Sequence, residues 1–71
     1  MITEILAPLT GKIVRINIKA GDSVFEDQDI LVIEAMKMET PIYAPCDGVI
    51  KNILLKEGDD VDEEDLIAVM E

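Results

Sequence analysis

A chain of 71 residues is long enough for one small domain and no more. Six basic against sixteen acidic side chains give a net charge of −10, which argues against nucleic acid or an anionic lipid surface as a partner. With no histidine and one cysteine, the chain lacks the residues for a Ser-His-Asp triad, the usual histidine zinc sites and an internal disulfide.

The rest of the composition indicates a folded component of something larger. Hydrophobic residues make up 49% of the chain, which is too much for a disordered acidic tail. No apolar run approaches the roughly 18 residues that a membrane span needs, and the N-terminus shows no signal peptide. We therefore expect a cytoplasmic domain that inserts in no membrane and has no catalytic residues or metal site of its own.

The residue pattern predicts eight short strands and no helix. Ile, Val and Thr make up 20 of the 71 residues, a density that favours strands. Within the second strand Val14, Ile16 and Ile18 alternate with polar neighbours, the pattern of a half-buried strand. The strands are expected near residues 2–7, 12–19, 23–25, 29–35, 38–43, 48–56, 60–62 and 66–71.

The segment 34–39 conflicts with this pattern because its residues have high helix propensity. Two observations favour a β-hairpin instead. Pro41 limits a helix after Ile33 to about one and a half turns, and the equivalent of 30–34 in the second half of the chain is the chain end, 67–71. We therefore predict a hairpin with its tip near Met36 and Lys37.

The chain contains an internal duplication. A shift of 37 positions aligns residues 7–34 with 44–71 without a gap and gives 13 identities in 28 pairs. Two copies are too few for a solenoid, so we expect one domain over 1–71, built from two half-units about a pseudo-twofold axis. This symmetry predicts that the hairpin tip and the paired termini lie at opposite ends of the molecule.

The duplication also predicts local backbone geometry. Every glycine falls at a shared position, where we expect a positive φ or a close backbone approach. Ile13 and Ile16 recur as Ile50 and Ile53, three residues apart in each copy. If both members of a pair face the core, a β-bulge must lie between them. The four glycines are Gly11, Gly21, Gly48 and Gly58.

Lys37 is the centre of the candidate site. It is the only basic residue between Lys19 and Lys51, and Met36 and Met38 flank it at the predicted tip. Most isolated turn lysines are simply solvated, so the residues around Lys37 must show whether it has a function. The string over 33–39, Ile-Glu-Ala-Met-Lys-Met-Glu, resembles the biotin-attachment signature, whose core reads Ala-Met-Lys-Met.

The remainder of the chain is also similar to biotinyl domains, in the segments 7–11, 21–24, 44–48 and 57–61. The resemblance covers essentially the whole chain. It implies an all-β fold, a flattened β-barrel or barrel-sandwich hybrid of two four-stranded antiparallel sheets, with the acceptor lysine on a hairpin tip. Because the two halves align without a gap, the chain resembles the thumbless type found in pyruvate carboxylases, propionyl-CoA carboxylases, transcarboxylases and decarboxylating sodium pumps.

The resemblance implies a biotin carboxyl carrier. A biotin protein ligase would join biotin to the Lys37 amine as an amide, and the domain would carry carboxybiotin between a biotin carboxylase and a carboxyltransferase or decarboxylase subunit. The flanking methionines would help these partners to recognise the domain and position the biotin, although methionines also fill core gaps. Glu34 and Ala35 belong to the same string, but Glu34 recurs as Glu71 and is equally explained as a strand-face charge.

Two alternatives to a biotin carrier stay open. A lipoyl domain has the same barrel and a modified lysine at the same tip, but its lysine usually follows Asp and precedes Ala, whereas Lys37 has Met on both sides. An unmodified barrel would serve only as an interaction module. The sequence names neither the acyl acceptor nor the parent enzyme, and it fits a small carrier subunit as well as part of a longer chain.

The other polar features have ordinary explanations. The seven acids in 57–65 do not follow the calcium-loop pattern, so we expect a solvated turn, which could steer the domain towards basic surfaces. Cys46 is expected to be a small, partly buried turn residue without a reactive role. Asp27 and Glu64 stand where many biotinyl domains have glycine, which puts the local turn geometry in question.

Overall fold

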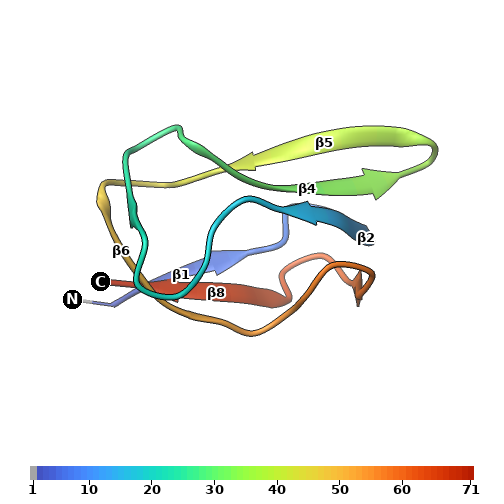
Figure 1. The fold of residues 1–71 in the computed structure, drawn as a ribbon. Coiled ribbons are helices and arrows are strands. Elements are labelled where there is room, and N and C mark those ends of the chain that lie inside the picture. The colour runs from blue at the N-terminus through green and yellow to red at the C-terminus, as the bar shows by residue number, and fades with distance from the viewer. Residues whose placement is uncertain (1) are drawn as a thin grey trace.

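The computed structural model describes residues 2–71, which fold into two four-stranded antiparallel sheets with no helix (Figure 1). The predicted all-β barrel-sandwich is confirmed, and all eight predicted strands are present. They are β1 (Thr3–Leu6), β2 (Gly11–Ile16), β3 (Ser23–Val24), β4 (Asp29–Ala35), β5 (Met38–Tyr43), β6 (Gly48–Ile53), β7 (Asp60–Val61) and β8 (Leu66–Met70).

Each sheet combines strands from both halves of the duplication. The strand orders are β1-β8-β6-β3 and β5-β4-β2-β7, so the repeat shift exchanges the two sheets. Matching hydrogen bonds show the same symmetry. The Gly21 amide donates to the Ile50 carbonyl and the Gly58 amide donates to the Ile13 carbonyl, both at 2.7 Å. Each half therefore supplies strands and hydrogen-bond partners that the other half needs.

The core lies between the two sheets and is wholly apolar. No polar or charged residue is buried among the described residues, and the fully buried side chains come from both halves. Burying a large aliphatic side chain contributes about 1.5–3 kcal/mol, so these residues are the main favourable term against the entropy lost on folding. The largest fully buried residues are Ile13, Ile30, Leu31, Ile33, Ile50, Ile67 and Met70.

The predicted bulge is present in both copies. In β2, Ile13 pairs with Ile33 and Arg15 pairs with Val32, so the register shifts across Val14. The matching shift in β6 falls between Ile50 and Asn52. The extra residue turns Val14 out to solvent, so the expected inward alternation of Val14 was wrong.

Both long strands end earlier than predicted, at Ile16 and Ile53 rather than at 19 and 56. The cause is a side-chain-capped turn that follows each strand. The Lys19 amide donates to the Asp22 carboxylate at 3.0 Å, and the Lys56 amide does the same to Asp59. Aspartate competes with the strand ladder for backbone donors, which ends the strand before its apolar pattern does.

Glycines lie where the duplication predicts special backbone geometry. Gly21 and its repeat mate Gly58 have positive φ, at 97° and 94°. At Gly11 a Cβ would overlap the carbonyl oxygen of Glu34 and come within 2.7 Å of Ile33 Cγ2. Only glycine lets β2 approach β4 this closely.

The positions of Asp27 and Glu64 keep the turn geometry that glycine would favour. Both residues are left-handed, with φ of 69° and 73°. This conformation lets the Asp27 amide donate to Ala44 O at 2.9 Å and the Glu64 amide donate to Ala7 O at 2.7 Å. The hydrogen bonds between the halves thus hold two non-glycine residues in a backbone conformation that costs about 1–2 kcal/mol per residue.

The hairpin of β4 and β5 projects at one end of the molecule, and the two termini lie at the other (Figure 1). The longest dimension is 33 Å, about twice the other two. The prediction from symmetry is confirmed, and the tip lies far from any connection through the termini.

Gly11→Ala should lower the free energy of unfolding by about 2–3 kcal/mol, the upper part of the range for overpacking, because a backbone carbonyl must move. Gly48→Ala is the matched control. There the nearest atom is the flexible end of the Met70 side chain, at 2.8 Å, and the nearest backbone atom, the Glu71 carbonyl oxygen at 2.9 Å, is farther away than the Glu34 oxygen is from Gly11, so a smaller shift is needed. Urea unfolding followed by circular dichroism should show a clearly smaller loss for Gly48→Ala, and equal losses would contradict the packing described.

Asp27→Gly and Glu64→Gly should each raise the free energy of unfolding by about 0.5–1 kcal/mol, because glycine adopts positive φ without strain but loses more chain entropy. Thermal melts should rise by several degrees in a domain of this size. Glu26→Gly is the control, since Glu26 is outside the left-handed region and its replacement should give no gain. A fall in melting temperature at position 27 or 64 would refute the strain argument.

Candidate functional site

Met36 and Lys37 form the two-residue turn between β4 and β5. Ala35 pairs with Met38 across the hairpin, and the two turn residues have φ of 55° and 66°. Positive φ at both central positions defines a type I′ turn, whose twist matches that of the flanking strands and which usually contains Asn-Gly. The predicted hairpin is therefore confirmed, and its turn contains no glycine.

The strands beneath the tip anchor it to the core. Ile33 of β4 is fully buried and pairs with Thr40, and Ile42 of β5 is 7% exposed and pairs with Leu31. Two long antiparallel strands with buried inner faces restrict the movement of the turn that joins them. The tip is thus an exposed turn on a firmly held support.

The side chains at the tip point into solvent. Met36 is 94% exposed and Met38 is 70% exposed, while Lys37 is exposed and Ala35 is half-buried. Core packing, the structural alternative for the two methionines, is therefore wrong. Exposed methionines offer a flexible, polarisable contact surface to a partner.

Within residues 2–71, the Lys37 amine has no ion-pair partner. Among residues 2–71 the one side-chain ion pair joins Lys51 and Glu71, at 3.0 Å. Glu34 and Glu39 face each other across the hairpin below the tip, and both are exposed. Lys12 on β2 pairs in register with Glu34. Two carboxylates placed opposite each other oppose hairpin stability and surround the tip with negative charge.

The five residues singled out from the sequence, Glu34 to Met38, lie together at the hairpin end because they are contiguous. Sequence reasoning missed the left-handed conformation of Met36 and Lys37. Its only signal was indirect, since a hairpin with two turn residues requires a type I′ or II′ turn. It also missed that Glu34 and Glu39 are cross-strand partners, which the turn length implies.

The acidic segment 57–65 supports turns rather than a metal site. Asp59 and Asp65 each accept a hydrogen bond from a backbone amide three residues earlier, and Glu57 accepts one from Ile16. Within 2–71, no group of three or more acidic or cysteine side chains is arranged to hold a metal ion. Cys46 is half-buried against the core, as expected.

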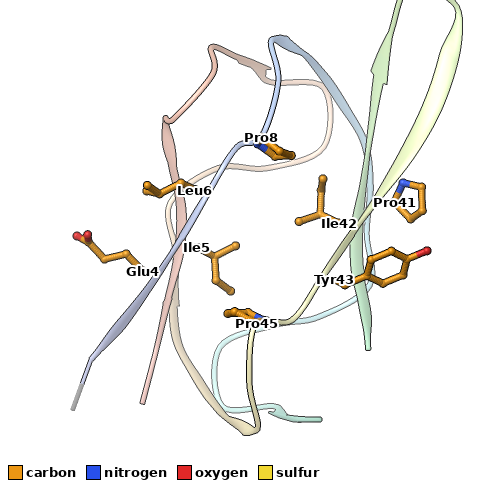
Figure 2. Close-up of a pocket in the computed structure, with 8 residues that line it drawn as sticks. All are labelled: Glu4, Ile5, Leu6, Pro8, Pro41, Ile42, Tyr43 and Pro45. Carbon is orange, nitrogen blue, oxygen red and sulfur yellow. The ribbon is translucent and has the colours of Figure 1, made fainter. Parts of the chain in front are cut away.

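A groove of about 360 Å³ lies between the edge strands β1 and β5, away from the tip (Figure 2). Its eight lining residues form four repeat pairs: Glu4 with Pro41, Ile5 with Ile42, Leu6 with Tyr43, and Pro8 with Pro45. The groove therefore lies on the pseudo-twofold axis, where the two sheets fail to join. It follows from the fold, and its titratable groups, the Glu4 carboxylate and the Tyr43 hydroxyl, point away from each other at opposite sides of the groove (Figure 2). No helix in the part of the chain described could cross a membrane.

Comparison with known proteins agrees with the fold and the tip. The family model described as biotin-requiring enzyme, which covers biotin and lipoyl attachment, matches residues 3–70. Over 37 residues, 52% of this chain, the sequence is 57% identical to the methylmalonyl-CoA carboxyltransferase 1.3S subunit of Propionibacterium freudenreichii subsp. shermanii. That stretch is 30% of the relative, so the match covers under a third of it.

Two solved structures share the fold along nearly the whole chain. The urea carboxylase of Kluyveromyces lactis superposes with a TM-score of 0.91 and 33% identity over 99% of this chain, which is 6% of that enzyme. The lipoyl domain of the 2-oxoglutarate dehydrogenase complex of Azotobacter vinelandii gives a TM-score of 0.82 and 31% identity, covering 96% of this chain and 94% of the domain. The fold alone therefore does not separate the two kinds of attachment.

Met36→Asn should stabilise the domain by about 0.5–1 kcal/mol, because Asn tolerates the left-handed conformation better than Met and the 94% exposed side chain gives up no packing. Met38→Asn is the matched control. It lies on a strand, where Asn is disfavoured, and should give no gain. Thermal melts of both variants test the turn type, and an equal effect at the two positions would contradict it.

Proposed function

The chain belongs to the biotin and lipoyl attachment family, and on that premise we propose that it is a biotin carboxyl carrier domain with Lys37 as the acceptor of biotin. The observation that carries the proposal is the string Ala-Met-Lys-Met at the tip of an anchored hairpin. Lys37 has methionine on both sides rather than the Asp and Ala that usually flank a lipoyl-lysine, which favours biotin.

The residues at the tip suit covalent attachment of a cofactor. An acceptor amine must reach into the active site of a modifying enzyme, and Lys37 is exposed, unpaired among residues 2–71 and remote from both termini. Its neutral amine would attack the acyl carbon of biotinyl-AMP, releasing AMP and a proton and forming an amide. The chain has no histidine, and the carboxylates nearest to Lys37, those of Glu34 and Glu39, lie below the turn on the strands. The base that takes up the proton would therefore come from the biotin protein ligase.

The domain's contribution after attachment is position and reach. Biotin, when bound, supplies a ureido nitrogen that takes up a carboxyl group at one active site and gives it up at another. The buried strands β4 and β5 hold the acceptor lysine on a support that needs little further ordering on docking. Tethering also raises the effective concentration of the cofactor at both sites.

The neighbours of Lys37 would serve recognition. Met36 and Met38 provide exposed thioether contacts on both sides of the modified lysine, and Ala35 adds no bulk at the closing pair of the turn. Glu34 presents a carboxylate to basic groups on a partner, in addition to its place on the strand face. The partners that would make these contacts are the biotin ligase, a biotin carboxylase and a carboxyltransferase or decarboxylase subunit.

The domain itself is proposed to be a non-catalytic component of a larger biotin-dependent enzyme. One unit over 1–71, with half-repeats 7–34 and 44–71, accounts for the interlocked sheets. The similarity to a carboxyltransferase subunit and to a urea carboxylase supports this class of assembly. The cytoplasmic location and the thumbless subtype stay predictions.

Co-expression with a biotin protein ligase should add one biotinyl group to each chain, because one lysine of five occupies the recognised tip. Intact-mass analysis should show this adduct in the wild type and in Lys51→Ala, and none in Lys37→Ala. Both lysines are exposed, so the control separates position from exposure.

The same measurement with a lipoate ligase addresses the lipoyl alternative. The test uses cells that contain both ligases. A chain that carries a lipoyl group on Lys37 and no biotinyl group would overturn the proposal in favour of a lipoyl carrier. A chain that accepts neither group would be an interaction module.

Replacing Met36 and Met38 together with leucine should slow biotinylation less than it slows carboxyl transfer. Carboxyl transfer should fall by about threefold to a hundredfold in kcat/KM, because the variant loses two thioether contacts of about 0.3–1.5 kcal/mol each. The biotinylation rate of the same variant is the internal control. Unchanged carboxyl transfer would show that the exposed methionines play no part in recognition.

A further inference from the structure

The methionines of residues 2–71 divide into two groups by exposure. Met70 is 1% exposed and packs in the core between the sheets, as its repeat mate Ile33 does. Met36 is 94% exposed and Met38 is 70% exposed at the hairpin tip. At position 70 methionine therefore fills the core, whereas at positions 36 and 38 the fold leaves most of the side chain in solvent.

The geometry of the hairpin keeps the two tip thioethers exposed. Met36 has φ of 55° in the type I′ turn, and Met38 pairs across the hairpin with Ala35, which has only a methyl group with which to cover it. The strands beneath are anchored by the buried Ile33 and Ile42, and the tip projects from the barrel (Figure 1). The exposure of both thioethers is thus a property of the folded chain and needs no local unfolding.

An exposed thioether reacts with peroxides. Its sulfur attacks one oxygen of hydrogen peroxide, so that an S–O bond forms and the O–O bond breaks. The proton on the transferred oxygen passes to the leaving hydroxide, which departs as water. The sulfur is oxidised by two electrons, the peroxide is reduced, and the product is a polar, chiral sulfoxide in place of an apolar side chain.

The charges around the tip determine which oxidants reach it. Glu34 and Glu39 face each other below the turn and are exposed, in a chain of net charge −10. Attachment of biotin as an amide would remove the positive charge of Lys37 from the turn. This field repels anionic oxidants but does not oppose the approach of neutral hydrogen peroxide. Hydrogen peroxide is therefore the oxidant that the site fits.

Oxidation at the tip changes the surface that the domain presents in its proposed function. A thioether gives a flexible, polarisable contact, whereas a sulfoxide carries a hydrogen-bond acceptor that must lose its water on docking. The core keeps its own methionine reduced, because Met70 is buried. An oxidised chain therefore keeps its fold and loses recognition by its partners.

We propose that Met36 and Met38 are sites of reversible oxidation by hydrogen peroxide, which lowers carboxyl transfer and leaves the barrel folded. This inference rests on the proposed function and adds a modification site to it. Methionine sulfoxide reductases of the two types, one for each sulfoxide epimer, restore the thioethers. Each reduction consumes a dithiol of the reductase, which becomes a disulfide, and releases the sulfoxide oxygen as water.

Peptide mapping by mass spectrometry, after a short treatment with dilute hydrogen peroxide, tests the modification site. The biotinylated chain should gain one oxygen atom at Met36 and one at Met38. Met70 should react at least about a hundredfold more slowly, because its oxidation requires the core to open. Oxidation of Met70 as fast as that of the tip, or unmodified methionines at the tip, would overturn the proposal.

Carboxyl transfer tests the consequence, with the partner subunits that co-purify with the chain from its source cells added after the peroxide has been removed. The kcat/KM of the oxidised wild type should fall by about fivefold to a hundredfold, the factor that corresponds to burying a polar group without a partner. Treatment with both reductases should restore it. Met70→Leu, which keeps the side-chain volume of the core, should respond to peroxide as the wild type does.

The variant with both Met36→Leu and Met38→Leu is the control for other targets of peroxide, because it keeps Lys37 for the cofactor and also Cys46. Its own kcat/KM should be the same before and after treatment. An equal loss in this variant would place the damage on the cofactor or on Cys46, and would refute the proposal. A fall in the melting temperature of the treated wild type would also refute it, since oxidation would then disturb the fold.

The same experiments separate this inference from the proposed function. A chain that never accepts biotin refutes the proposed function, and with it the effect on carboxyl transfer, while peptide mapping still measures the modification site. A biotinylated chain whose tip methionines are oxidised and whose carboxyl transfer is unchanged refutes only the present proposal.

Discussion

The interlocking of the two half-repeats is the constraint on which the rest of the structure depends. Each sheet takes strands from both halves, and the bonds from Gly21 to Ile50 and from Gly58 to Ile13 join them at equivalent points. Neither half can bury its isoleucines alone, so the domain is expected to fold as one unit. The segment that links the halves must then leave the barrel and return, and it does so as the β4–β5 hairpin.

This arrangement explains why the candidate site is an exposed turn on a rigid base. Met36 and Lys37 occupy the turn in a left-handed conformation that glycine would adopt more easily. Strain persists where the surrounding structure determines it, and here Ile33 and Ile42 hold the strands below. In the proposed function the lysine must be present at the tip for its amine, so the turn accepts a conformational cost that a purely structural hairpin would avoid.

Much of the fold could be predicted from the sequence because the same residue pattern occurs in both half-repeats. The shared spacing of Ile13 and Ile16 predicted a bulge, and the duplication predicted where the tip lies relative to the termini. The ends of β2 and β6 could not be predicted from apolar pattern, because Asp22 and Asp59 capture backbone amides before the pattern ends. The left-handed conformation of Met36 and Lys37 depends on the turn type, and the pairing of Glu34 with Glu39 depends on the strand register; the folded chain defines both.

The central claim is that position at the hairpin tip, and not exposure, makes Lys37 the acceptor. The chain offers four other lysines, Lys12, Lys19, Lys51 and Lys56, and all of them are exposed. Fragmentation mass spectrometry of the native chain, purified from its source cells, measures which lysine is modified. The account predicts biotin on Lys37 alone; biotin on any of the other four, or a different acyl group on Lys37, would contradict it.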